Sequence, residues 1–121
     1  MAEQADLKPM IWVGSSRRDY RAMPPDVQSR MGYALYVAQR GDKHRSAKPL
    51  KGFGGASVVE IVADHQGDTF RCVYTVRLAG VVYVLHVFQK KAKAGRATPR
   101  TELALIAQPL REAERISHGE G

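Results

Sequence analysis

Cysteine is almost absent from this chain of 121 residues, which contains only Cys72. A single cysteine cannot form an internal disulfide, and it leaves no cysteine-based zinc site. The histidines and carboxylates also lack the spacing of metal ligands, so we expect no metal and no other cofactor. A reducing cytoplasm is therefore the expected location of the protein.

Long hydrophobic runs are missing as well. No segment approaches the roughly 20 apolar residues that a membrane-spanning helix needs. The first six residues are polar and acidic, and they have neither the basic start nor the apolar middle of a signal peptide. The composition, with 44% apolar residues, fits one folded domain with a single core. We expect a flexible leader over 1–8, one domain over 9–116, a tail over 117–121 and no membrane partner.

Acidic residues are the minority charge. The chain has 12 Asp and Glu against 19 Lys and Arg, which gives a net charge of +7 and favours a polyanion such as nucleic acid as partner. Many of the cations fall into two short segments, 40–51 and 89–100, although two ordinary solvated loops would look similar. The cations of these segments are Arg40, Lys43, Arg45, Lys48, Lys51, Lys90, Lys91, Lys93, Arg96 and Arg100.

The segment 69–93 predicts a β-hairpin. Two runs of β-branched and aromatic residues flank Ala79 and Gly80, a typical tight turn. If Leu78 pairs with Val81, then Thr75 lies opposite Val84, Val73 opposite His86 and Arg71 opposite Phe88. Side chains alternate along a strand, so one face carries Arg71, His86, Phe88 and Lys90. The other face is apolar, with Phe70, Cys72, Tyr74, Val76, Leu78, Val81, Tyr83, Leu85 and Val87.

Helices are expected on both sides of this hairpin in the sequence. A short strand over 9–13 precedes a short helix with Ser16 as N-cap and Asp19 in the place of a capping-box acid. A second helix begins at Pro25 or Asp26 and ends near Gln39, before a basic and glycine-rich irregular segment over 41–55. Its apolar stripe consists of Val27, Met31, Ala34, Leu35 and Ala38.

The rest of the chain predicts one more strand and one more helix. The strand over 57–64 alternates weakly, with Glu60 on one side and Ile61 on the other. The last helix begins with Thr98 as N-cap and Pro99 at its first position, and Pro109 should kink or divide it. We therefore expect an α+β fold: a small twisted antiparallel sheet with an N-terminal helical hairpin and a C-terminal helix. The helices would pack on its apolar side and leave a basic face open.

This order of elements, with these residues, resembles the RelE/ParE superfamily of toxins from type II toxin–antitoxin systems. The resemblance is greatest to its HigB-like, phage-associated branch, and it extends from about Val13 to Arg115. The segments that carry it are Gly32–Tyr36, Ala47–Gly52, Phe70–Tyr74, Val84–Lys91 and Thr98–Pro99.

The resemblance implies a RelE-like, microbial-RNase-like fold and a function. Members of the superfamily commonly cleave messenger RNA on the ribosome, which inhibits translation, and a helix-turn-helix antitoxin neutralises them. The basic site of the family maps here to Lys48, Lys51, Arg71, Lys90 and Lys91. The chain departs from the family pattern near Glu60, where a usual arginine is missing, and His118 is no secure counterpart of a C-terminal catalytic residue.

The residues themselves fit metal-independent RNA cleavage. That reaction uses the 2′-hydroxyl as nucleophile and needs a proton acceptor, positive charge on the phosphate and a proton donor for the leaving oxygen. Arg71 is the expected phosphate clamp because its planar fork matches two phosphate oxygens. Lys90 and Lys91 would add positive charge.

Glu60 and His86 are the candidate proton carriers, but each has a structural alternative. Glu60 could simply pair with Arg71, and His86 could be a hydrogen-bonded sheet residue. Phe88 could stack on a base or cap the core. Lys48, Lys51 and Arg96 are the expected contacts to the RNA backbone.

Two other functions remain open at the level of sequence. A ParE-like protein would inhibit DNA gyrase by binding and would not need Arg71, His86 and Lys90 in one row. A non-catalytic RNA-binding or ribosome-binding module would use the same cations only for phosphate contacts, and its binding would depend steeply on salt. The Walker pattern of nucleotide hydrolases is absent.

Overall fold

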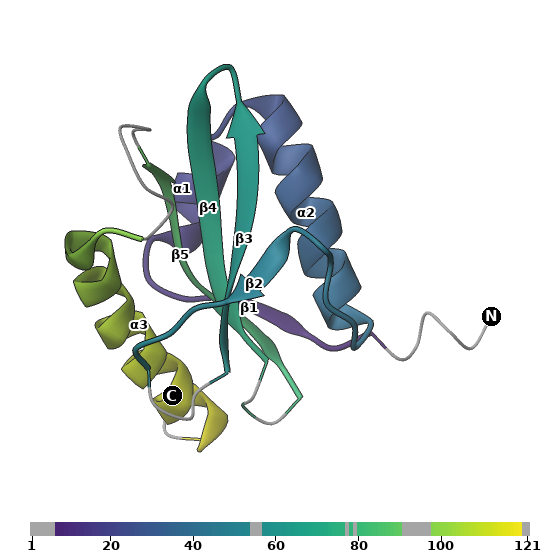
Figure 1. The fold of residues 1–121 in the computed structure, drawn as a ribbon. Coiled ribbons are helices and arrows are strands. Elements are labelled where there is room, and N and C mark those ends of the chain that lie inside the picture. The colour runs from purple at the N-terminus through teal and green to yellow at the C-terminus, as the bar shows by residue number, and fades with distance from the viewer. Residues whose placement is uncertain (1–6, 54–56, 77, 79, 91–97, 120–121) are drawn as a thin grey trace.

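A computed structural model describes residues 7–53, 57–76, 78, 80–90 and 98–119. Its sheet has five strands in the order β1-β5-β4-β3-β2, and β1 runs parallel to β5 while the other pairs are antiparallel. Helices cover both faces of the sheet, with α1 and α2 on one side and α3 on the other (Figure 1). The elements are β1 (Met10–Trp12), α1 (Ser16–Arg21), α2 (Pro25–Gln39), β2 (Ala47–Pro49), β3 (Val58–His65), β4 (Asp68–Thr75), β5 (Val82–Lys90) and α3 (Arg100–Ser117).

The predicted α+β class is confirmed, and α2 matches its prediction closely. Proline at its first position and Asp26 in its first turn suit a helix N-terminus. Arg40 is the C-cap, and Gly41 follows with a φ of 96°, which favours glycine. All five residues of the predicted apolar stripe are buried in the core that α2 forms with the sheet.

The predicted hairpin between β4 and β5 is present and turns where expected, because the N–H of Val81 donates to the carbonyl of Leu78 at 3.1 Å. Strand β4 ends at Thr75 and β5 begins at Val82, so the ladder does not reach Leu78 and Val81. Arg77 and Ala79 lie outside the described residues. Another tight hairpin joins β3 and β4, where Gln66 and Gly67 both have positive φ, as a type I′ turn requires.

A bulge in β5 changes the predicted faces of the sheet. Arg71 does lie opposite Phe88, and Val73 opposite His86, but Tyr74 lies opposite Val84 and Thr75 opposite Tyr83. The prediction of Thr75 opposite Val84 was therefore wrong. Leu85 is the extra residue, and an extra residue reverses the alternation beyond it.

The sheet consequently has an apolar core on each face. Tyr83 and Leu85, predicted on the same face as Cys72, belong to the core beneath α3, whereas Val82 and Val84 face α2. The prediction of an open basic face was wrong, because α3 covers much of it. The α3 core contains Val13, Val58, Val73, Tyr83, Leu85, Phe88, Ile106 and Ala113.

Local signals at the helix ends were misassigned in two places. Ser16 is the first residue of α1 rather than its cap, and its hydroxyl donates a buried hydrogen bond to the carbonyl of Val84. Pro99 is the N-cap of α3, while Thr98 lies before the helix. Pro109 does not divide α3, which is one continuous helix. Of the helices that the structure describes, none is both long and apolar enough to cross a membrane.

The short strand β2 was not predicted: it lies within the segment 41–55, which we expected to be irregular. It pairs at the edge of the sheet with Val59, Glu60 and Ile61. Proline cannot donate a backbone hydrogen bond, so Pro49 is compatible with an edge strand and not with a central one.

Burial of Cys72 predicts a loss of stability at high pH. Desolvation raises the pKa of the Cys72 thiol to about 12, and burial raises the pKa of Tyr74 to about 12. Both groups stay neutral in the folded chain while they ionise in the unfolded chain, so their contribution is present at neutral pH and is lost as pH rises from about 9 towards 12. We expect the free energy of unfolding in urea to fall by about 1.4 kcal/mol per pH unit once the unfolded thiol has ionised.

The variant Cys72→Ala is the control for this prediction. Its free energy of unfolding should remain level to a higher pH, because only the tyrosine effect is left. An equal alkaline slope in both proteins, or native-state labelling of Cys72 by a thiol reagent at the rate of the unfolded chain, would contradict the assignment.

Candidate functional site

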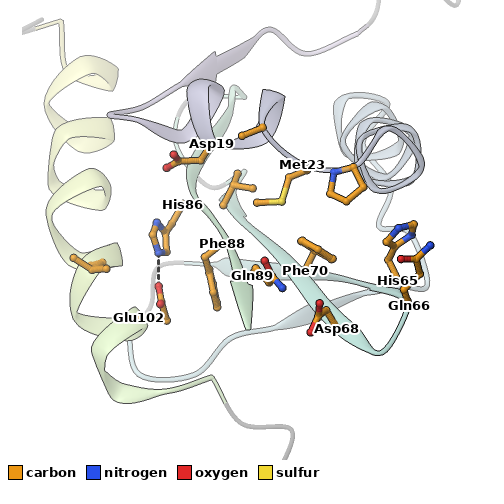
Figure 2. Close-up of a pocket in the computed structure, with 14 residues that line it drawn as sticks. Asp19, Met23, His65, Gln66, Asp68, Phe70, His86, Phe88, Gln89 and Glu102 are labelled. Atoms are coloured by element: carbon orange, nitrogen blue, oxygen red, sulfur yellow. Dashed lines mark hydrogen bonds and ion pairs between the residues drawn. The ribbon is translucent and has the colours of Figure 1, made fainter. Parts of the chain in front are cut away.

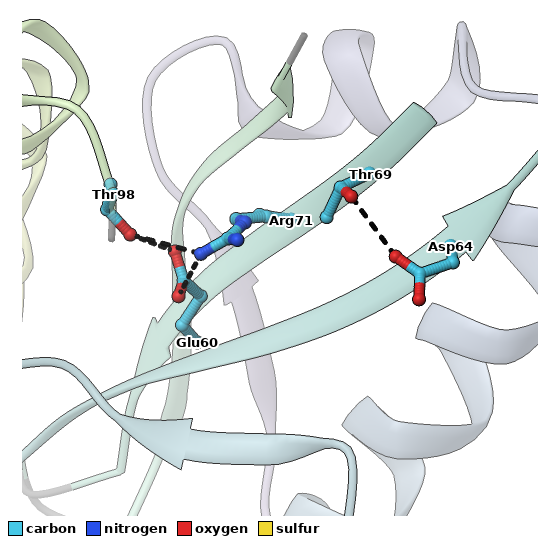
Figure 3. Close-up of polar contacts among 5 residues, drawn as sticks. All are labelled: Glu60, Asp64, Thr69, Arg71 and Thr98. Atoms are coloured by element: carbon cyan, nitrogen blue, oxygen red, sulfur yellow. Dashed lines mark hydrogen bonds and ion pairs between the residues drawn. The ribbon is translucent and has the colours of Figure 1, made fainter. Parts of the chain in front are cut away.

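The face of the sheet beneath α3 carries two groups of polar side chains. The first, called here the ion-pair cluster, consists of Glu60, Arg71 and Thr98 (Figure 3). The second, the histidine cluster, consists of His86, Phe88 and Glu102. Both contain residues from the sheet together with a residue from the N-terminal end of α3 or the segment just before it.

The ion-pair cluster is buried. Glu60 and Arg71 are 5% and 6% exposed, and Nη1 of Arg71 donates to Oε1 of Glu60 at 2.8 Å. The hydroxyl of Thr98 donates to Oε2 of Glu60 at 2.6 Å and accepts from Nη1 of Arg71 at 3.3 Å. Nε of Arg71 is buried without a hydrogen-bond partner among the described residues.

This geometry gives Glu60 the pairing role that the sequence left as an alternative. Arg71 was expected on an open face, but Glu60 and the segment before α3 enclose it. A buried carboxylate and guanidinium are tolerated because each neutralises the other, and the threonine hydroxyl satisfies further hydrogen-bonding capacity. The unpartnered Nε of Arg71 is a donor that another group could satisfy.

The histidine cluster lies on β5 and the first turn of α3. Nε2 of His86 and Oε1 of Glu102 are 2.7 Å apart, and the two side chains are 15% and 25% exposed (Figure 2). The ring of Phe88 stacks on the imidazole with a centroid distance of 5.0 Å. A carboxylate on one ring nitrogen fixes the orientation of the imidazole and leaves Nδ1 as the acceptor in the neutral ring.

The two clusters share one sheet face. Val73 of β4 lies opposite Glu60 on one side and opposite His86 on the other. The strand spacing therefore separates their backbones by about 10 Å. Thr98 and Glu102 are four residues apart, so the start of α3 spans the distance between the clusters.

A cavity of about 750 Å³ opens beside the histidine cluster. Strand β1 pairs only with Val82–Val84, and no other described strand covers the rest of β5 on that side. The cavity lies along this edge, and Figure 2 shows His86 and Phe88 at its wall. Its polar lining residues are Asp19, His65, Gln66, Asp68, His86, Gln89 and Glu102.

Such a site can move a proton and hold a planar group. The imidazole is the side chain best suited to proton transfer near neutral pH, and a cavity of several hundred Å³ can contain a nucleotide. Among the described residues, no group of His, Cys, Asp and Glu could hold a metal ion.

The predicted cations are placed less centrally. Lys48 is exposed on β2 opposite Glu60, and Lys51 is exposed in the loop after it. Lys90 is the last residue of β5, lies opposite Thr69 and is 9% exposed. Lys91 and Arg96 lie outside the described residues.

Sequence reasoning missed Glu102 and misjudged Thr98. An acidic residue in the first turn of a helix is explained by the helix dipole alone, so Glu102 gave no further signal. Its contact with His86 depends on α3 crossing the sheet face, which no local pattern indicated.

The fold and the arrangement of these elements define the class of RelE toxin-like α+β proteins. Escherichia coli toxin RelE, solved in the free state as a double arginine-to-alanine mutant, superposes with a TM-score of 0.57 over 88% of this chain and 97% of its own, at 16% identity. The toxin–antitoxin complex RelBE2 from Mycobacterium tuberculosis gives a TM-score of 0.49 at 17% identity, over 70% of this chain and 93% of that one.

Residues 18–111 match the family model described as phage-derived protein Gp49-like (DUF891), so the chain belongs to that family. The predicted phage-associated relationship is thereby confirmed, and the superposition on RelE confirms the predicted fold. No curated protein sequence matches the chain significantly.

Proposed function

We propose that this protein is the toxin of a type II toxin–antitoxin system and a ribosome-dependent messenger RNA endonuclease, an mRNA interferase that inhibits translation. The observation that carries the proposal is the pairing of His86 with Glu102 at the wall of a cavity of about 750 Å³. It occurs in a chain that has the fold of the toxin RelE and a net charge of +7.

In the proposed reaction the 2′-hydroxyl of the message attacks the adjacent phosphorus. Nδ1 of His86 accepts the hydroxyl proton, while Glu102 holds the other ring nitrogen and stabilises the imidazolium that forms. The bond from phosphorus to the 5′-oxygen breaks, the leaving oxygen takes a proton from solvent, and the products are a 2′,3′-cyclic phosphate and a 5′-hydroxyl. Phe88 would support the imidazole and contact a base.

Positive charge on the phosphate would come from the cations around the two clusters. Arg71 offers its unpartnered Nε, and Glu60 holds the guanidinium in place. Because Arg71 is 6% exposed, contact with a phosphate requires its guanidinium to become more accessible than it is in this structure. Lys90 and Lys91, at the end of β5 and just beyond it, together with Lys48, Lys51 and Arg96, would attract and position the RNA backbone.

The proposal includes two partners besides the message and the ribosome. A helix-turn-helix antitoxin would bind the toxin and block its site, and the pair would act in the cytoplasm without a membrane or a cofactor.

Expression in bacteria followed by mapping of transcript 5′ ends tests the activity. New 5′ ends that vanish in His86→Gln, a variant expected to fold, support it, and an unchanged transcript map with loss of gyrase supercoiling supports gyrase inhibition instead.

A substitution of Lys48 tests whether this residue contacts the RNA, with a smaller expected effect on cleavage. We expect Lys48→Gln to lower ribosome-dependent cleavage by about 10-fold at physiological salt, because one phosphate contact is lost. The defect should shrink as salt is raised, because the lost phosphate contact contributes less at high salt. Arg111→Gln removes the same charge from an exposed position on α3 and should leave the rate unchanged. Equal rates for the two variants would remove Lys48 from the RNA path.

A further inference from the structure

The outer face of α2 carries two exposed tyrosines. Tyr33 and Tyr36 are 58% and 39% exposed, and their ring centroids are 6.2 Å apart. His44, from the loop after the helix, meets the ring of Tyr33 edge-on at 5.6 Å. We call these three residues the aromatic patch. Their rings are held next to one another by the helix and the loop, and much of the tyrosine surface remains in contact with water.

Cations surround the aromatic patch. Arg40 lies one turn after Tyr36 on the same helix face, and Lys43 and Arg45 flank His44 in the loop. All three cations are exposed, and Asp42 is the one acidic residue in this part of the chain. The patch is therefore aromatic at its centre and basic at its side.

A second cavity, of about 490 Å³, opens next to Tyr33 and His44. It lies at the edge of β3, where the short strand β2 ends its pairing at Ile61. Ile61, Val62 and Ala63 line one part of it, and the hydroxyl-bearing Ser29 and Ser46 line another. Arg30 also lines it, tied to Asp26 at 2.8 Å and to the backbone carbonyl of Asp64.

We propose that this surface is a binding site for single-stranded RNA, separate from the histidine cluster. One base stacks on Tyr33 or Tyr36, a neighbouring base enters the cavity beside Tyr33, and Arg40, Lys43 and Arg45 contact the phosphates. Helix α2 covers the opposite face of the sheet from α3 (Figure 1), so the two sites face different sides of the molecule.

The chemistry of the patch favours a single strand over other partners. Unpaired bases expose their flat faces, and stacking on aromatic side chains is the main sequence-independent contact to them. A duplex hides these faces. A protein partner would need acidic groups opposite three cations and an apolar surface, whereas RNA supplies phosphates and rings in one chain.

Binding can be measured without cleavage, so the inference does not depend on the proposed endonuclease. The probe is a fluorescent 12-nucleotide 2′-O-methyl RNA, which has no free 2′-hydroxyl, added to the full-length chain. We expect Tyr33→Ala to weaken binding about 5-fold to 100-fold, in the range for the loss of one stacked base. Tyr33→Phe retains the ring and should bind like the parent.

Two further comparisons test whether RNA binding depends on the cations and whether it prefers single-stranded RNA to a duplex. Arg40→Gln should weaken binding and flatten its salt dependence by about one phosphate contact, while Arg111→Gln on α3 should do neither. A 12-base-pair duplex of the same chemistry should compete poorly. Unchanged binding by Tyr33→Ala in a variant with native circular dichroism, or equal competition by the duplex, would overturn the proposal.

Discussion

Replacing Arg71 with methionine is expected to lower the free energy of unfolding by about 3–5 kcal/mol. The substitution leaves the carboxylate of Glu60 in a site that is 5% exposed, with only the hydroxyl of Thr98 as its remaining hydrogen-bond donor among the contacts that hold it. An unpaired buried charge costs far more than the pair itself contributes. Urea unfolding monitored by the fluorescence of Trp12 measures the difference.

The double variant that also replaces Glu60 with methionine is the decisive control. Replacing both charged side chains with apolar ones of similar volume should restore most of the stability, because neither side chain then needs solvation. It should still fail to cleave RNA if Arg71 contacts the phosphate, which separates the structural from the catalytic role. A cost below about 1 kcal/mol in Arg71→Met would place the pair among solvent-screened ion pairs and contradict its burial.

Replacing His86 with glutamine is expected to lower the rate of message cleavage by about 10²-fold to 10⁴-fold. The amide keeps a polar group next to Glu102 but cannot accept the 2′-hydroxyl proton. The effect should be on kcat, measured in single-turnover cleavage on programmed ribosomes, with KM for the ribosome nearly unchanged. Folding should be intact because the side chain is at the cavity wall.

In the proposed reaction Glu102 acts through His86 and not on the substrate, so its variants should behave differently. Glu102→Gln should lower kcat less than His86→Gln, and the double variant should be no worse than His86→Gln alone. The shorter Glu102→Asp should recover part of the rate. Additive losses in the double variant would mean that Glu102 does not work by positioning the imidazole.

The sequence predicted those parts of the fold that depend on local periodicity. The apolar stripe from Val27 to Ala38 predicted a helix with one buried face. The alternation around Ile61 predicted a strand whose successive side chains point to opposite faces of the sheet. The pairing of Arg71 with Phe88 followed from the predicted hairpin register, in which Leu78 lies opposite Val81. These predictions needed no knowledge of distant contacts.

The predictions failed where a single irregularity or a distant contact decides the structure. One extra residue, Leu85, exchanges the faces of the residues before it, and no residue type marks such a bulge. The placement of α3 over the second face depends on the packing of Ile106 and Ala113 against the sheet. That placement buries Arg71 and brings Glu102 to His86, so the contacts made by Thr98 and Glu102 were invisible in the sequence.

The central claim is that this chain cleaves messenger RNA through its histidine cluster. The most direct test incubates the purified chain with ribosomes that carry a defined message, and then examines the new 3′ ends. The account predicts fragments ending in a 2′,3′-cyclic phosphate for the parent chain and at least a 100-fold lower yield for His86→Gln. An intact message with the parent chain, or equal cleavage by a folded His86→Gln variant, would contradict it.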